Sequence, residues 1–309
     1  MMKKIFLAAV FSLLQSCTFL FFYPTPEIVL TPAELGLAYK DVVLTTPDGL
    51  RLHAWDIPAV LPEGTPSKGT ILFLHGNAEN ISTHTFGVVW LVLAGYDLFA
   101  LDYRGYGQSE GAPDLKGMET DINTALKYLT EHKNGKLFVL GQSLGGSLAI
   151  ATLAESPYRN EVSGVIVDSA FSSTRRIARE KAAGVWFLWP FQYPLSLLVE
   201  ENAPDERVKL LSMPTFFVTT AQDRVVPPHH TRLLYENAPP PKEIVIAPKG
   251  DHIHAFGEAE VRRRLMDFLE QAPVPGKGSH SNPGGFHAPS QPPQQHILHS
   301  RHVRIQQSQ

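Results

Sequence analysis

Five short stretches of this sequence are continuously apolar, apart from the threonine that begins two of them. They occupy residues 70–74, 98–101, 137–140, 165–167 and 215–218. A strand that is apolar on both faces belongs to a sheet that is covered on both sides, because a solvated face would carry alternating polar residues. These stretches therefore predict the buried strands of a layered α/β domain.

Segments of helical length and periodicity separate these strands. They span about residues 82–94, 116–131, 144–154, 174–183, 229–237 and 258–271. Two further runs, 39–45 and 51–56, flank a Pro-Asp-Gly turn signal and predict an antiparallel hairpin, and residues 243–246 supply the last strand. The order predicts an α/β fold with a mainly parallel, doubly wound, eight-stranded sheet and helices on both faces.

The composition favours one folded domain and argues against nucleic acid as a partner. Hydrophobic residues make up 43% of the 309 residues and charged residues 18%, which is enough apolar material for a large core. The formal net charge is -3, and the Lys and Arg residues are scattered, so no basic surface is expected to attract a phosphate backbone. We expect a single domain over residues 35–270.

The N-terminus has the pattern of an export signal. Lys3 and Lys4 precede an apolar run over residues 5–14, and the sequence Leu-Gln-Ser that ends before Cys17 resembles a bacterial lipobox. The resemblance implies cleavage before Cys17 and acylation of this residue, which is the single cysteine of the chain. Residues 1–17 are then a lipoprotein-type signal and membrane anchor, and residues 18–34 a linker.

Two alternatives to this anchor stay open. Residues 5–23 have about the length of a membrane-spanning helix, and a cleaved secretory signal that leaves a buried free cysteine is the third interpretation. With either form of anchor the chain is held at a membrane, and we expect its folded part to lie outside the cytoplasm.

Two segments interrupt the alternation of strands and helices. Residues 184–204 contain five aromatic residues and fit neither a strand nor a regular helix, so they form either a small lid over an apolar pocket or a packed loop. Residues 271–309 are rich in Pro, Gly, Gln, Ser and His and predict a disordered tail. Nothing near the tail histidines fixes a coordination geometry, so no metal site is predicted there.

One serine stands between a predicted strand and a predicted helix. The sequence Gly141-Gln142-Ser143-Leu144-Gly145 follows the strand that ends at residue 140 and opens the next helix. Glycines two positions before and two after Ser143 let the neighbouring backbone pass close to a sharp, strained turn. This context predicts a nucleophile elbow with Ser143 as the nucleophile.

A nucleophilic serine needs a general base and an acid that orients the base. Asp223 follows the strand at 215–218 and His252 follows the strand at 243–246, so both are expected at the same sheet edge as Ser143. Asp168 is the alternative acid, and His254 the alternative base.

Neighbouring charged residues are expected to be structural. We expect Asp251 to be a loop or capping residue, and His229 and His230 to be surface residues at the start of a helix. Asp102 and Arg104 are expected to brace loops.

The oxyanion of the reaction needs preorganised N–H donors. The backbone N–H of Leu144 is one candidate, because it follows the nucleophile at a helix start. The second is the N–H of Asn77, in the loop after the strand at 70–74. The alternative is that this loop is an ordinary strand-to-helix turn.

The motifs together resemble those of the α/β-hydrolase superfamily, and the likeness covers about residues 35–270. The motifs are His75-Gly76-Asn77-Ala78, Asp102-Tyr103-Arg104-Gly105-Tyr106-Gly107-Gln108-Ser109, Gly141-Gln142-Ser143-Leu144-Gly145-Gly146, Asp223-Arg224-Val225-Val226-Pro227 and Gly250-Asp251-His252. They are most similar to those of membrane-tethered α/β-hydrolase-domain proteins, a group that includes acyl-protein depalmitoylases. This chain departs from them in carrying Ile253 and His254 after His252, which leaves the triad complete and the substrate class open.

We therefore expect a serine hydrolase that cleaves a carboxylic ester or thioester through an acyl-enzyme, without a metal or an organic cofactor. Its partner is then a small-molecule or acylated substrate. The alternatives are a serine peptidase of aminopeptidase-like character and a noncatalytic membrane-anchored binding protein of the same fold.

Overall fold

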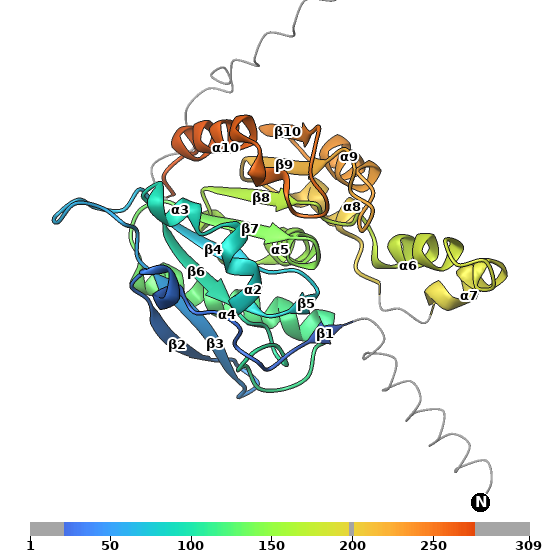
Figure 1. The fold of residues 1–309 in the computed structure, drawn as a ribbon, viewed down its shortest axis with the longest axis horizontal. Helices are drawn as coiled ribbons and strands as arrows, with labels where there is room; N and C mark the ends of the chain where they lie inside the picture. The colour runs from blue at the N-terminus through green and yellow to red at the C-terminus, as the bar shows by residue number, and fades with distance from the viewer. Residues whose placement is uncertain (1–21, 198–200, 276–309) are drawn as a thin grey trace, which may run out of the picture. The chain divides into compact units, whose positions relative to one another are not determined.

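The computed structural model describes residues 22–197 and 201–275, which form an eight-stranded sheet with helices on both faces (Figure 1). The strand order is β10-β9-β8-β7-β4-β6-β3-β2. The strands are β2 (Lys40–Thr45), β3 (Arg51–Ile57), β4 (Thr70–Leu74), β6 (Asp97–Leu101), β7 (Leu137–Gln142), β8 (Gly164–Asp168), β9 (Thr215–Thr220) and β10 (Lys242–Ala247).

The pairing directions confirm the predicted sheet. All neighbours from β10 to β6 pair in parallel, whereas β3 pairs antiparallel with both β2 and β6. The hairpin between β2 and β3 turns at Gly49, which has a φ of 89°, and the amide of Thr46 donates to the Leu50 carbonyl at 2.9 Å.

Each parallel strand is buried on both faces because its side chains enter two separate cores. In β4, Leu72 and Leu74 join one core and Ile71 and Phe73 join the other. The first core is covered by α4 (Leu115–His132), α5 (Leu144–Glu155) and α9 (His229–Asn237), and the second by α2 (Ile81–His84), α3 (Trp90–Leu93) and α10 (Ala259–Gln271). Burial of both strand faces therefore explains the apolar runs without alternation, as inferred from the sequence.

Two helical predictions differ from the structure. The helix expected at 82–94 is broken into α2, a 3-10 turn at Thr85–Gly87 and α3. Gly87, Val88 and Val89 explain the break, because glycine and β-branched residues are poor helix formers. The aromatic stretch after α6 (Thr174–Ala183) forms a 3-10 turn, Trp189–Phe191, and a short helix, α7 (Gln192–Leu197), which packs against α6; α8 (Pro204–Arg207) follows.

The chain enters the domain through a two-stranded sheet next to the main one. In this sheet β1 (Tyr23–Pro24) pairs in parallel with β5 (Ala78–Glu79). Asn80 fixes the segment that follows β1, because its side-chain amide donates to the carbonyls of Thr25 and Glu27 at 2.9 and 2.7 Å. Part of the segment expected as a linker is therefore packed against the domain.

The predicted lipidation site Cys17 and the tail histidines lie outside the described residues. Among residues 22–197 and 201–275, no helix has both the length and the apolar character that a membrane crossing requires.

Candidate active site

The predicted site residues follow four parallel strands at one edge of the sheet. Since β4, β7, β8, β9 and β10 are parallel, their carboxyl ends meet at the same edge. Asn77 follows β4, Ser143 follows β7, Asp223 follows β9 and His252 follows β10. A shallow hollow lined partly by Thr70 lies at the opposite edge, where strands begin, and is separate from these residues.

Ser143 lies on a sharp turn between β7 and α5. Its φ of 53° is in the left-handed region, and its amide donates to the Asp168 carbonyl at 2.8 Å. A Cβ at Gly141 would lie 2.4 Å from the Gly145 carbonyl oxygen, and a Cβ at Gly145 would lie 2.1 Å from the Leu74 carbonyl oxygen. Both glycines are therefore required for the close approach of β4, β7 and α5 that forms the elbow.

Asp223 and His252 are brought into direct contact by the loops that carry them. Nδ1 of His252 lies 2.7 Å from Oδ2 of Asp223, whose side chain is buried. The other carboxylate oxygen accepts the amides of Val225 and Val226 at 2.9 and 2.8 Å. Burial alone would raise the pKa of Asp223, but the hydrogen bonds from His252 and these amides outweigh burial and hold the pKa below its usual value.

This contact assigns the tautomer of His252. A carboxylate accepts hydrogen bonds only, so Nδ1 carries the proton, and in the neutral ring Nε2 then has the free lone pair. His252 also interacts electrostatically with Asp168, the residue whose carbonyl holds the Ser143 amide. No hydrogen bond joins Ser143 to His252 among the described residues; catalytic hydrogen bonds are often long before a substrate binds.

The alternative acid and base are differently placed. The Asp168 carboxylate accepts hydrogen bonds from the Gln142 amide at 2.9 Å and the Ser169 hydroxyl at 3.0 Å. Burial raises the pKa of Asp168 to about 6. His254 has an exposed side chain, and the Asp251 carboxylate accepts the amide of His252 at 2.9 Å, as expected of a capping residue. The geometry therefore favours Asp223 and His252 as the pair.

The two predicted oxyanion donors lie on segments that are in contact. Leu144 is the first residue of α5, so its N–H belongs to the helix start that lacks an intrahelical acceptor. The close approach of Gly145 to the Leu74 carbonyl brings this helix start against the end of β4, three residues before Asn77. The Tyr106 hydroxyl contacts both the Asn77 carbonyl and its side-chain oxygen, at 3.0 and 3.1 Å, which holds this loop.

The loops around the site are braced by buried charges. The Asp102 carboxylate accepts the Ile81 amide at 2.9 Å, and Arg104 forms hydrogen bonds with Asp121 and Asp48. These contacts confirm the structural role that the sequence predicts for Asp102 and Arg104.

Two histidines near the site, His75 and His84, have no role predicted from the sequence. His75 is fully buried, and burial lowers its pKa to about 3. His84, at the end of α2, has its pKa lowered by burial and by the charge of His252. No periodicity marks either residue, because their burial results from loops that fold over the end of β4.

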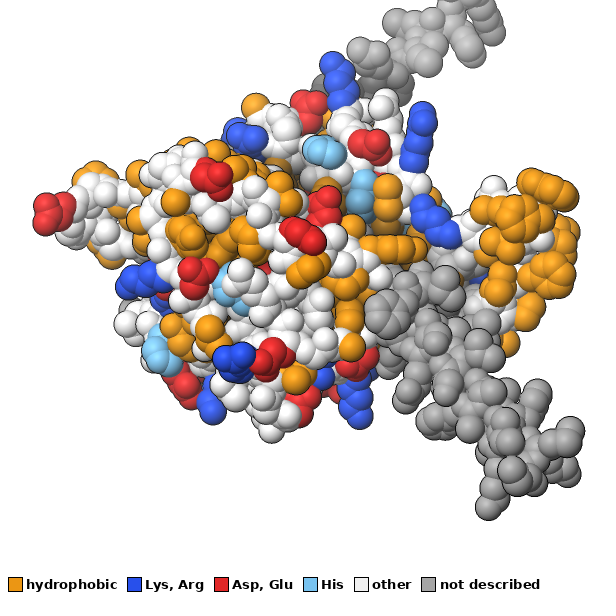
Figure 2. Space-filling model, turned by 60° about the horizontal axis from the view of Figure 1, so that its bottom comes forward, with side chains coloured by type: hydrophobic (Ala, Val, Ile, Leu, Met, Phe, Trp, Pro, Cys, Tyr) orange, Lys and Arg blue, Asp and Glu red, His pale blue; other side chains and the backbone are white. Residues whose placement is uncertain are grey.

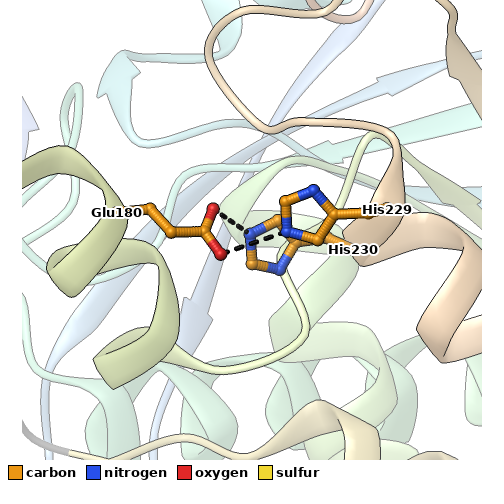
Figure 3. A group of neighbouring side chains, drawn as sticks. All are labelled: Glu180, His229 and His230. Atoms are coloured by element: carbon orange, nitrogen blue, oxygen red, sulfur yellow. Dashed lines mark hydrogen bonds and ion pairs between the residues drawn. The ribbon is translucent and has the colours of Figure 1, made fainter. Parts of the chain in front are cut away.

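A cluster of Glu180, His229 and His230 has the composition of a metal site (Figure 3). The Ser172 amide donates to Nδ1 of His230 at 3.1 Å, so Nε2 carries the proton and donates to Glu180 at 3.0 Å. A metal ion needs the lone pair of that nitrogen, so the cluster carries no metal assignment. The expectation that His230 is a surface residue is wrong, because its side chain fills the space between α6 and α9; His229 is exposed, as expected.

Comparisons with known proteins agree with this architecture. A family model described as serine aminopeptidase, S33, matches residues 65–203. The chain is 33% identical over 260 residues to the Arabidopsis thaliana alpha/beta hydrolase domain-containing protein WAV2, covering 78% of this chain and 82% of that protein. It is 32% identical over 247 residues to a Saccharomyces cerevisiae protein named as a membrane protein, covering 77% and 82%.

Among solved structures, an esterase from Pyrococcus furiosus is similar with a TM-score of 0.65 and 24% identity, covering 82% of this chain and 98% of that one. At this identity the likeness concerns the fold.

Proposed function

Because this chain belongs to the α/β-hydrolase superfamily, we propose that it is a serine hydrolase that cleaves a carboxylic ester or thioester with Ser143 as its nucleophile. The observation that carries the proposal is the 2.7 Å hydrogen bond between His252 and the buried Asp223 at the sheet edge where the strained Ser143 lies. A residue held at positive φ without being glycine costs free energy, and such strain is typical of catalytic turns.

The proposed reaction is a two-step acyl transfer. Nε2 of His252 removes the proton from the Ser143 hydroxyl as its oxygen attacks the acyl carbonyl, and Asp223 stabilises the imidazolium that forms. The N–H groups of Leu144 and Asn77 stabilise the negative charge on the carbonyl oxygen. His252 then protonates the leaving alcohol or thiol. In the second step His252 removes a proton from water, which attacks the acyl-enzyme, and then returns the proton to the Ser143 oxygen as the acyl group leaves.

A second candidate function is peptide hydrolysis, and the description of the matching family model as a serine aminopeptidase favours it. It uses the same catalytic residues and differs in the substrate. A noncatalytic binding protein is the remaining alternative. The Asp223 contact argues against it, because a binding module has no need of an imidazole oriented by a buried carboxylate.

A fluorophosphonate probe tests whether Ser143 is a nucleophile. We expect covalent labelling of the full chain, loss of labelling in Ser143→Ala, and retention in Ser147→Ala, whose hydroxyl is buried and bonded to the Phe171 carbonyl at 2.9 Å. Unlabelled, folded wild-type protein would support the binding protein instead. Hydrolysis of p-nitrophenyl esters of graded chain length, measured against aminoacyl amides, then separates esterase from peptidase.

We also propose that Cys17 is acylated and holds the enzyme at a membrane, outside the cytoplasm. The relative named as a membrane protein and the lipobox-like sequence support this proposal. Cys17→Ala should move the protein from the detergent phase to the aqueous phase in a partitioning assay. Unchanged partitioning would indicate a spanning helix.

A further inference from the structure

Residues 184–197 expose more apolar side chain than a soluble surface usually carries. We call this segment, between the end of α6 and the end of α7, the aromatic tip. Figure 2 shows the hydrophobic side chains gathered there. In the aromatic tip, Trp186 is 86% exposed. Five more large apolar side chains of the tip are over half exposed: Phe187, Trp189, Phe191, Tyr193 and Leu197. Contiguous apolar patches of this kind mark sites of interaction.

The composition of the aromatic tip indicates which partner it suits. It contains no Asp, Glu, Lys or Arg, and it combines two tryptophans and one tyrosine with aliphatic and phenylalanine side chains. Trp and Tyr have an apolar body and a polar edge, so they concentrate where hydrocarbon meets lipid headgroups. The helix that leads into the tip, α6, carries four basic residues. Arg175 pairs with Glu201 and Arg176 with Asp205, so Arg179 and Lys181 are the α6 cations without an acidic partner among the described residues. Basic residues beside an apolar surface favour an anionic membrane.

The aromatic tip is held outward by supporting contacts. The guanidinium of Arg179 lies 5.4 Å from the centre of the Tyr193 ring, which joins α6 to α7. Glu180 joins α6 to His229 and His230 on α9. These contacts fix the base of the segment and leave its aromatic side chains in solvent, which is the arrangement of a surface element and not of a closed lid.

The aromatic tip and the entry of the N-terminal segment are on the same side of the sheet. The segment that carries the tip starts at Thr174, six residues after the carboxyl end of β8. The chain enters at β1, which pairs with β5 directly after Asn77, again past a carboxyl end, that of β4. Both therefore flank the edge where Ser143 lies.

We propose that the aromatic tip inserts into the surface of a lipid bilayer, as a contact additional to the N-terminal anchor, so that the active-site edge of the sheet faces the lipid. The proposal rests on the exposed aromatic side chains and on their position relative to β1. It does not require Ser143 to be catalytic.

Tryptophan fluorescence of the full chain on vesicles tests the proposal. The four tryptophans are Trp55, Trp90, Trp186 and Trp189, so the segment before residue 55 contributes no signal. In vesicles of brominated phosphatidylcholine and phosphatidylglycerol, wild-type emission should shift to shorter wavelength and be quenched. The double variant Trp186→Phe, Trp189→Phe should lose this quenching, whereas Trp90→Phe, the matched control on α3, should keep it.

Three results would overturn the proposal. The first is that bromolipid fails to quench the emission of the wild-type protein, either because the bound protein is not quenched or because the protein stays in the aqueous fraction. The second is a spectral shift that depends on protein concentration and not on bromolipid, which would identify a second copy as the occupant. The third is a shift on binding of an active-site inhibitor without lipid, which would identify a lid.

Discussion

Replacing His75 by glutamine should remove part of the acid sensitivity of this protein. The His75 ring is buried between Tyr103 and Tyr106, with ring centres 4.6 and 5.0 Å away, and Nδ1 donates to the Gly76 carbonyl at 2.8 Å. Burial lowers the pKa of His75 from 6.5 to about 3. In the unfolded chain His75 therefore binds a proton below about pH 6.5, whereas in the folded chain it binds one only below about pH 3.

The sign of the effect follows from this difference in bound protons. Because the unfolded state binds more protons within this window, the free energy of unfolding falls as the pH falls, by about 1.4 kcal/mol for each pH unit. Relative to pH 8, the loss due to His75 is about 0.8 kcal/mol at pH 6 and about 2 kcal/mol at pH 5. Glutamine does not titrate, so His75→Gln should lack this contribution whatever its stability at pH 8.

Urea unfolding of the full chain in mild detergent, followed by circular dichroism at pH 5, 6 and 8, measures the two slopes. His254→Gln is the matched control, because it makes the same substitution at an exposed side chain. Parallel pH dependence in wild type and His75→Gln would refute the argument that burial keeps this imidazole neutral.

Two further predictions concern the catalytic edge. Asp223→Asn should lower kcat on p-nitrophenyl esters on the order of 10⁴-fold with an unchanged circular dichroism spectrum, because the imidazole loses its oriented tautomer. Asp168→Asn should retain most activity. A larger loss of kcat in Asp168→Asn than in Asp223→Asn would make Asp168 the acid. Gly145→Ala should cost about 1–3 kcal/mol in urea unfolding and slow probe labelling, because the new Cβ meets the Leu74 carbonyl oxygen. Gly257→Ala, where the Cβ has open space, should do neither, and equal effects in both variants would exclude the clash as the cause.

The sheet could be predicted from the sequence because its signal is local. Each strand from Thr70–Leu74 to Thr215–Thr220 contains an uninterrupted apolar run, and that pattern depends on burial at both faces. The shared sheet edge of Ser143, Asp223 and His252 could be predicted for a similar reason, because parallel strands bring their carboxyl ends together.

What the sequence did not reveal depends on contacts between distant loops. The pairing of Tyr23 with Ala78 has no pattern of its own, since two residues are too few for a periodicity. The buried His230 contacts Ser172 and Glu180, and the buried His75 contacts Tyr103 and Tyr106, all of which are distant in the sequence. The break after α2 was missed because the apolar spacing of residues 82–94 outweighed the low helix propensity of Gly87 and its neighbours.

The docking of β1 beside the Asn77 loop limits how far the proposed enzyme can reach. If Cys17 carries the lipid, only residues 18–22 connect the lipid-bearing residue to the first paired strand. Five residues span at most about 18 Å when fully extended. A connection this short would keep the proposed catalytic residues close to the membrane surface. Acyl groups at that surface would then be present at high local concentration, and acyl groups far from the membrane would be out of reach.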